Sequence, residues 1–141
     1  GIDPERLQFV EEMESREAHL ANLTDVDIAL DPFPFNGCNT TLEALWMGIP
    51  VVTPAGDRFL SRMGASVLTR IGLPELVTRD DDGYVAAAAA LAADKARRAD
   101  LRRGLRQRLS GSLLCDPVAY ARSIETAFVA LWRDRNRVGP A

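Results

Sequence analysis

The chain of 141 residues has few of the side chains that build metal centres and disulfide frameworks. It contains one histidine, His19, and two cysteines, Cys38 and Cys115, which are far apart in the sequence. A site with two histidine ligands therefore cannot be built from this chain alone, and the cysteines form no metal-ligand pattern. We expect no metal cofactor, and the low cysteine content favours a reducing, cytoplasmic environment.

The chain also lacks an excess of positive charge and a long apolar run. Its formal charge is −3 and its pI is about 5.2, whereas nucleic-acid binders usually have a basic face. No apolar run is long enough to span a membrane, and no secretory leader pattern opens the sequence. We therefore expect neither nucleic acid nor a membrane as partner. The apolar content of 47% is sufficient for the core of one domain.

The segment from Asp31 to Thr53 is the most informative part of the chain. It has the pattern of a buried strand end, a loop of Pro, Gly and Asn, a helix over residues 40–47 that opens on two threonines, and a second buried strand. Hydroxyls and free backbone N–H groups at a helix start form an anion site, and the helix dipole favours negative charge there. This segment predicts a phosphate-bearing ligand at the edge of an α/β sheet.

Apolar periodicity and turn residues predict the remaining elements. Strands are expected at residues 6–10, 26–30, 50–53 and 75–78, with helices at 15–23, 40–47, 58–71, 80–93, 94–109 and from 117 onward. This alternation predicts a doubly wound, Rossmann-like α/β fold with a parallel sheet of about four strands, ending in helices. Because such a sheet is small and has an open edge, we interpret the chain as the back half of a larger nucleotide-binding domain, and the edge favours a homodimer.

Several side chains have expected structural roles. The predicted helix caps are Ser15, Asp94, Asp116 and, at a helix end, Gly48, whereas Asp80, Asp81 and Asp82 are expected to place negative charge at a helix start. The last helix carries an apolar stripe of Ile124, Phe128, Leu131 and Trp132, and both tryptophans, Trp46 and Trp132, are expected in the core. The arginines at positions 97, 98, 102, 103, 106 and 108 are expected to form a solvated helix face.

The central part of the chain resembles a known family. The resemblance rests on Asn36-Gly37, Thr40-Thr41, the run from Glu43 to Thr53, and the block from Gly56 to Ser66. These residues are similar to the C-terminal catalytic region of O-GlcNAc transferase and its SPINDLY-like relatives, in which tetratricopeptide repeats precede a two-lobed GT-B glycosyltransferase. The similarity covers nearly the whole chain and implies the back half of the lobe that holds a UDP-sugar.

The resemblance implies roles for individual residues. The tandem threonines would contact the diphosphate, aligned either as Thr40-Thr41 or as Asn39-Thr40, and Glu43 would hold the ribose. His19 would pack on the uracil, and Arg16 stands near the ribose where the family often has lysine. The implied nucleotide-sugar-binding residues are Arg16, His19, Asn36, Gly37, Asn39, Thr40, Thr41 and Glu43. The family's catalytic groups lie outside this chain, its acceptor is a protein Ser or Thr hydroxyl, and no essential metal is implied.

Each candidate also has a structural alternative. Thr40 and Glu43 fit a capping box, in which each side chain bonds to the backbone N–H of the other. Asn36 and Gly37 are typical turn formers, Cys38 is a small semi-buried residue, and Asp31 either opens a turn or faces the ligand edge of the sheet. At the level of function, the alternatives are a non-catalytic nucleotide-binding or interaction scaffold, and a different nucleotide-sugar enzyme with the same architecture.

Overall fold

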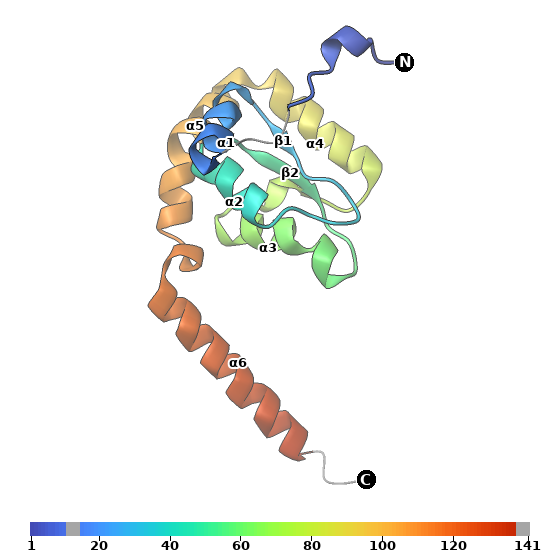
Figure 1. Cartoon of the computed structure of the whole chain (residues 1–141). Helices are drawn as coiled ribbons and strands as arrows, with labels where there is room; N and C mark the ends of the chain where they lie inside the picture. Colours follow the sequence, from blue (N-terminus) through green and yellow to red (C-terminus); the bar gives the residue numbers. More distant parts are fainter. Residues whose placement is uncertain (11–14, 138–141) are drawn as a thin grey trace.

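The computed structural model describes residues 1–10 and 15–137, which fold around a small parallel sheet (Figure 1). In the described residues the sheet has three strands in the order β1-β2-β3, namely β1 (Ala29–Leu30), β2 (Val51–Pro54) and β3 (Val77–Thr78). Ala29 pairs with Val51 and Thr53 pairs with Val77, both in parallel register. All residues of β2 are buried, as expected for the central strand of a parallel sheet covered on both faces.

Helices surround this sheet and provide most of the ordered structure. They are α1 (Arg16–Asn22), α2 (Asn39–Trp46), α3 (Met63–Arg70), α4 (Asp81–Ala93), α5 (Lys95–Ser110) and α6 (Pro117–Arg137). Short 3₁₀ turns occupy Pro4–Arg6, Leu23–Asp25, Phe59–Ser61, Pro74–Leu76 and Leu113–Cys115. Helices α2, α3 and α4 contact β2, and α5 packs on α2 and α4. Across the described ranges, no helix combines the length and apolarity needed to cross a membrane.

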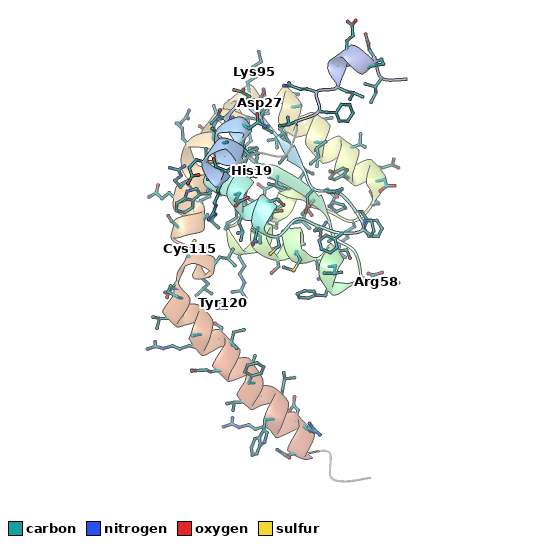
Figure 2. All side chains as sticks on the ribbon, in the orientation of Figure 1. His19, Asp27, Arg58, Lys95, Cys115 and Tyr120 are labelled. Atoms are coloured by element: carbon teal, nitrogen blue, oxygen red, sulfur yellow. The ribbon has the colours of Figure 1, made fainter. Side chains whose placement is uncertain are left out.

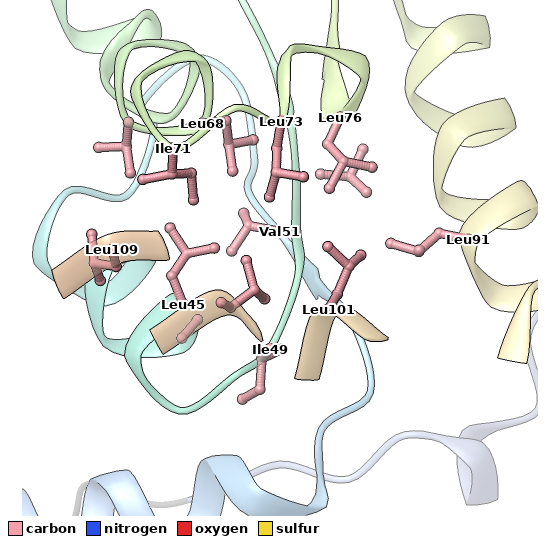
Figure 3. Packing of buried hydrophobic residues seen from close by; sticks show 14 residues of the cluster. Leu45, Ile49, Val51, Leu68, Ile71, Leu73, Leu76, Leu91, Leu101 and Leu109 are labelled. Carbon is pink, nitrogen blue, oxygen red and sulfur yellow. The ribbon is translucent and has the colours of Figure 1, made fainter. Parts of the chain in front are cut away.

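The hydrophobic core lies between β2 and the helices around it (Figure 3). Leu45 from α2, Val51 from β2 and Leu68 from α3 have at most 1% of their surface exposed, and Leu105 from α5 is fully buried. Each such side chain contributes roughly 1.5–3 kcal/mol relative to an exposed position. The core therefore fixes α2 against the sheet, and this holds the loop between β1 and α2 in place.

The helix ends follow the sequence closely. The predicted N-caps Ser15, Asp94 and Asp116 are confirmed, and Asp80, expected only as negative charge at a helix start, is a cap as well. Each of these side chains accepts a backbone hydrogen bond of 2.7–3.1 Å from the first turn of its helix. Gly48 has a φ of +82°, the left-handed conformation that glycine adopts after a helix end. Local chemistry was sufficient to predict these termini.

The strand expected at residues 6–10 is wrong. Residues 4–6 form a 3₁₀ turn, and Leu7, Phe9 and Val10 have at least half of their surface exposed. A strand needs a hydrogen-bonded neighbour, and within the described residues β1 pairs with β2 alone. The sheet therefore has three strands where about four were expected.

Three further elements are shorter than expected. The strand expected at residues 26–30 is reduced to Ala29–Leu30, and Leu30 is 57% exposed. The predicted helix over residues 58–71 splits into a 3₁₀ turn and α3, because Arg62 leaves the helical region with φ −125° and ψ 1°. The predicted strand at residues 75–78 begins only at Val77, since Pro74 starts a 3₁₀ turn before it. The starts of α3 and β3 are therefore both set by the 3₁₀ turn that precedes them.

The apolar stripe of α6 is exposed, not buried. Figure 1 shows α6 leading away from the rest of the chain, and Phe128, Leu131 and Trp132 are 65–68% exposed. Trp46 is also 40% exposed and is covered on its ring face by the Arg106 guanidinium, 5.3 Å from the ring centroid. The prediction that both tryptophans lie in the core is therefore wrong.

The arginines of α5 are not simply a solvated face. Arg98 donates to the carbonyl oxygens of Leu91 and Ala92 at the end of α4, and Arg106 donates to the carbonyl oxygen of Trp46 at the end of α2. Carbonyl groups at a helix C-terminus lack partners in the helix, so a cation there is favourable. These two arginines brace the neighbouring helices.

Two other arginines of α5 make contacts outside their own helix. Arg102 donates to the carbonyl oxygens of Thr24 and Val26, just before β1, and Arg97 forms an ion pair with Glu75. Arg102 is exposed and the Arg97 side chain is 42% exposed, so both still belong to a solvated face. Their contacts were not expected, because the partner residues are distant in the sequence and give no local pattern.

We expect Arg106→Ala to lower the free energy of unfolding by about 1 kcal/mol, because the Trp46 carbonyl loses a charged donor and the ring loses its cation. Urea unfolding measures this change. Arg108→Ala is the matched control, since Arg108 is exposed and makes no hydrogen bond within the described chain. Equal destabilisation by the two substitutions would contradict a bracing role for Arg106.

Candidate functional site

The site is organised around Asp31, which follows β1 directly. Its side chain is 5% exposed, with Oδ1 accepting from the N–H of Gly37 and Oδ2 accepting from the hydroxyl of Thr53, both at 2.6 Å. Thr53 lies on β2 and is fully buried. One carboxylate therefore ties the ends of two neighbouring strands to the loop that leads into α2.

Gly37 is required because the threonine hydroxyls lie against it. A Cβ atom there would be 2.5 Å from Thr40 Oγ1 and 2.7 Å from Thr41 Oγ1. Its N–H is already bonded to Asp31, so this N–H is not available to donate to a ligand. Thr41 is 4% exposed and belongs to the buried face of α2, whereas Thr40 is exposed.

The first turn of α2 is not capped by a side chain. The helix begins at Asn39, and Cys38 occupies the N-cap position without a side-chain hydrogen bond. The capping box expected for Thr40 and Glu43 is therefore wrong, since Glu43 points to other partners. Within the described chain the N–H groups of this turn remain open to an anion. Cys38 is exposed, not semi-buried as expected.

Asn36 braces the same loop from inside. It is 1% exposed, and its Nδ2 donates to the carbonyl oxygens of Pro32 at 3.2 Å and Pro54 at 3.5 Å. Its backbone N–H donates to the carbonyl oxygen of Leu60 at 3.1 Å. The loop is thereby attached both to itself and to the end of β2, which is more than the turn-forming role expected for Asn36.

Glu43 is held by two side chains of α1. Arg16 Nη2 lies 3.3 Å from Glu43 Oε1, and His19 Nε2 lies 3.5 Å from Glu43 Oε2. Figure 2 shows His19 on α1, next to α2. The Glu43 side chain is 20% exposed and the Arg16 side chain is 73% exposed. A carboxylate has about four lone-pair positions, so Glu43 retains capacity to accept ligand hydroxyls.

Two adjoining hollows expose these residues. One, of about 520 Å³, is lined by His19, Asp31, Asn36, Gly37, Thr40 and Thr41, among others. The other, of about 820 Å³, is lined by Arg16, Glu43 and a more apolar wall that includes Trp46 and Leu109. Asn39 lines both hollows, so the eight residues predicted from the sequence gather around the first turn of α2.

The described ranges contain no group of three histidine, cysteine or acidic side chains arranged to hold a metal ion. The site instead offers hydroxyls, backbone N–H groups and the partly exposed carboxylate of Glu43. Such groups suit a ligand with phosphate oxygens at one end and hydroxyls at the other.

Sequence reasoning missed three members of the Asp31 cluster. Thr53 bonds to the carboxylate, Gly64 on α3 leaves room for it, and Tyr84 on α4 lies near its charge. Burial raises the pKa of the Tyr84 phenol above its ordinary 10.0, and the negative charge of Asp31 raises it further. Asp31 and Thr53 could have been paired from the sequence, because they end adjacent parallel strands.

With this geometry established, comparison with known proteins identifies the family. The model of glycosyl transferase family 41 matches residues 1–124. The chain belongs to this family. It confirms the resemblance to the O-GlcNAc transferase and SPINDLY-like glycosyltransferases that the block around Thr40 indicated.

Individual relatives agree with this assignment. A tomato (Solanum lycopersicum) protein named probable UDP-N-acetylglucosamine–peptide N-acetylglucosaminyltransferase SPINDLY is 38% identical over 133 residues, covering 94% of this chain and 14% of its own length. A Caenorhabditis elegans UDP-N-acetylglucosamine–peptide N-acetylglucosaminyltransferase is 31% identical over 133 residues, covering 94% of this chain and 12% of its own.

A solved structure resembles the fold closely. It is a mutant of the O-GlcNAc transferase of Thermobaculum terrenum, with a TM-score of 0.83 and 39% identity over 96% of this chain and 26% of that chain. The present chain thus spans about one seventh of the tomato relative and about a quarter of the solved structure. Both of these proteins extend well beyond the region that matches this chain.

We expect Gly64→Ala to destabilise the protein by about 1–3 kcal/mol, although alanine is the better helix former, because its Cβ would collide with Asp31 and with Thr53 Cβ at 2.9 Å. Gly104→Ala is the control, since a Cβ there meets nothing within 4 Å on α5 and should stabilise by roughly 0.5–1 kcal/mol. Thermal unfolding distinguishes the signs. Stabilisation by both substitutions would contradict the close packing around Asp31.

We expect Asp31→Asn to lower the pKa of Tyr84, because a neighbouring negative charge no longer opposes formation of the tyrosinate. The pKa should stay above 10.0, since burial is the larger cause and is unchanged. A raised pKa in the folded state means that the stability contributed by Tyr84 is present below the unfolded pKa of about 10 and is lost as pH rises through the folded value.

Ultraviolet titration on a Tyr120→Phe background measures this pKa, because Tyr84 is then the remaining tyrosine. Asp100→Asn, which removes an exposed carboxylate from α5, is the control. An unchanged Tyr84 pKa in the Asp31 variant would show that its charge does not reach the phenol.

Proposed function

We propose that this chain is the C-terminal part of the donor-binding lobe of a GT-B glycosyltransferase, where it holds a UDP-sugar such as UDP-GlcNAc. The observation that carries the proposal is the uncapped first turn of α2, beside the hydroxyl of Thr40 at the carboxyl edge of a parallel sheet. In α/β sheets, ligands bind in the crevice outside this edge. The names of the family 41 relatives support UDP-N-acetylglucosamine as the donor.

The diphosphate would bind at the start of α2. The N–H groups of the first turn and the exposed Thr40 hydroxyl donate to its oxygens, and the helix dipole favours its charge. Transfer of the sugar leaves negative charge on this diphosphate, so donors placed here stabilise the transition state as well as the bound donor. On this proposal no essential metal is needed, because N–H and O–H groups offset the charge.

The nucleoside would bind beside α1. Glu43 accepts from the ribose hydroxyls with the oxygen capacity that Arg16 and His19 leave free, and the imidazole of His19 packs on the uracil. Asn39, which lines both hollows, lies between the diphosphate and the ribose. On this proposal one nucleotide spans both hollows, with Thr40 and His19 at the smaller one and Glu43 and Arg16 at the larger one.

The rest of the enzyme would supply the chemistry. We place no catalytic residue in this chain, and a doubly wound Rossmann-like lobe, completed by upstream residues, would present the sugar to a protein Ser or Thr hydroxyl. Alone, the chain would bind nucleotide weakly and be inactive. Cytoplasmic location and homodimer formation stay predictions from the sequence.

A second candidate is a non-catalytic scaffold that has kept the fold. It is favoured by Cys38 and Asn39, which stand where the resembled family more often has Gly, His or Thr, and by the exposed apolar stripe of α6. The natural full-length sequence distinguishes the candidates, because the resemblance implies that a transferase carries a phosphate-binding lysine and a catalytic histidine outside the residues present here.

We expect UDP to raise the thermal midpoint of the natural full-length protein, since a ligand that binds only the folded state stabilises it by about 2.7 kcal/mol at 100 times its Kd. Thr40→Ala should weaken UDP binding about tenfold, the value of one charge-assisted hydrogen bond. A thermal unfolding scan with and without UDP measures the first effect, and isothermal titration with UDP, alongside UDP-GlcNAc transfer to a peptide, measures the second.

Thr69→Ala is the matched control, because Thr69 is an exposed threonine on α3. It should change neither UDP affinity nor transfer. The proposal fails if the full-length protein shows no UDP shift and Thr40→Ala changes nothing. Binding of UDP without any transfer or hydrolysis of UDP-GlcNAc would instead support the scaffold.

A further inference from the structure

Asp31 is a buried carboxylate to which the proposed function has assigned no role. Its side chain is 5% exposed, and both of its oxygens accept hydrogen bonds from within the protein. Among the described residues, no arginine, lysine or histidine lies within ion-pair distance of it. Burying an uncompensated carboxylate is costly, so the position calls for an explanation.

The two hydrogen bonds of Asp31 explain why a carboxylate suits this position better than a neutral side chain. Gly37 N–H and Thr53 O–H are both donors, and an ionised carboxylate accepts from both at once. The two distances of 2.6 Å are at the short end for hydrogen bonds to a charged acceptor. The single side chain of Asp31 thus joins the end of β2 to the loop.

The loop in turn sets the threonine hydroxyls. With its N–H held by Asp31, Gly37 lies directly beneath Thr40 Oγ1 and Thr41 Oγ1, and leaves no space for a side chain between them. If the Asp31 bond is lost, Gly37 is free to move, and the open first turn of α2 loses its fixed surroundings. Donors that must meet a diphosphate work best when they are held in place beforehand.

We propose that Asp31 is a positioning residue for the diphosphate of the donor, acting through Gly37 on the first turn of α2 without touching the ligand. This inference rests on the proposed function, because it assumes a nucleotide diphosphate at that turn. Its consequence is selective: Asp31 governs binding of the phosphates and has no part in binding the nucleoside, which is held by Glu43, Arg16 and His19.

The test compares UDP with uridine, which lacks the phosphates, on the natural full-length protein. Asp31→Ala should weaken UDP at least tenfold, by titration, while uridine stays within about twofold, since one charge-assisted bond at the loop is lost. Asp31→Asn should recover most of the UDP affinity, because its Oδ1 still accepts from Gly37 N–H and its Nδ2 donates to Thr53 Oγ1.

Two further variants cover the case in which Asp31→Ala does not fold. Thr53→Val removes only the second carboxylate bond and should weaken UDP several-fold with uridine unchanged. Thr78→Val, at the same edge of the sheet, removes the hydroxyl that donates to the Thr53 carbonyl oxygen at 3.4 Å and should change neither affinity.

Parallel losses of UDP and uridine affinity in the Asp31 or Thr53 variants would overturn the proposal, because they would show a general structural defect. Unchanged UDP affinity in those variants would overturn it as well. If the unmodified full-length protein binds neither UDP nor uridine, the proposed function itself fails and this inference fails with it. The two failures are distinct, because one appears before any substitution is made.

Discussion

The structure depends on one buried carboxylate that joins backbone and side chain across two strands. Through the hydrogen bonds of Asp31 to Gly37 and Thr53, the ends of β1 and β2 share a single anchor with the loop before α2. The hydrophobic core fixes α2 against the sheet, and the hydrogen bonds of Asp31 fix the loop that leads into its first turn. The free energy of burying the charge is thereby offset by two strong hydrogen bonds, and the resulting rigidity lies next to the hollows.

How much the sequence predicted depends on whether the signal was local. The caps at Ser15, Asp94 and Asp116 were predictable because a cap bonds within its own first turn. The grouping of Glu43 with Arg16 and His19 was expected only through the resemblance to a family, since α1 and α2 are separate elements whose contact no periodicity reveals. The structure shows Glu43 in contact with both side chains, and the role of each residue toward a ligand stays a proposal.

The failures share a physical cause, which is that burial and bonding are decided by distant partners. The stripe containing Phe128 and Trp132 has the pattern of a buried face, but no described part of the chain covers it. The opposite error concerns Arg98 and Arg106, whose charges suggest solvent but whose guanidinium groups meet carbonyl oxygens at the ends of other helices. The capping box at Thr40 failed for a similar reason, because Glu43 bonds to α1 instead of its own helix start.

The packing of the loop divides its positions by their freedom to vary. Gly37 accepts no side chain and Asn36 is enclosed, whereas Cys38 and Asn39 are exposed and make no side-chain hydrogen bond in the described chain. Both free positions border the hollows, and neither supports the core. Randomising residues 38 and 39 alone therefore gives a small library in which the lining of the two hollows changes while the fold is preserved.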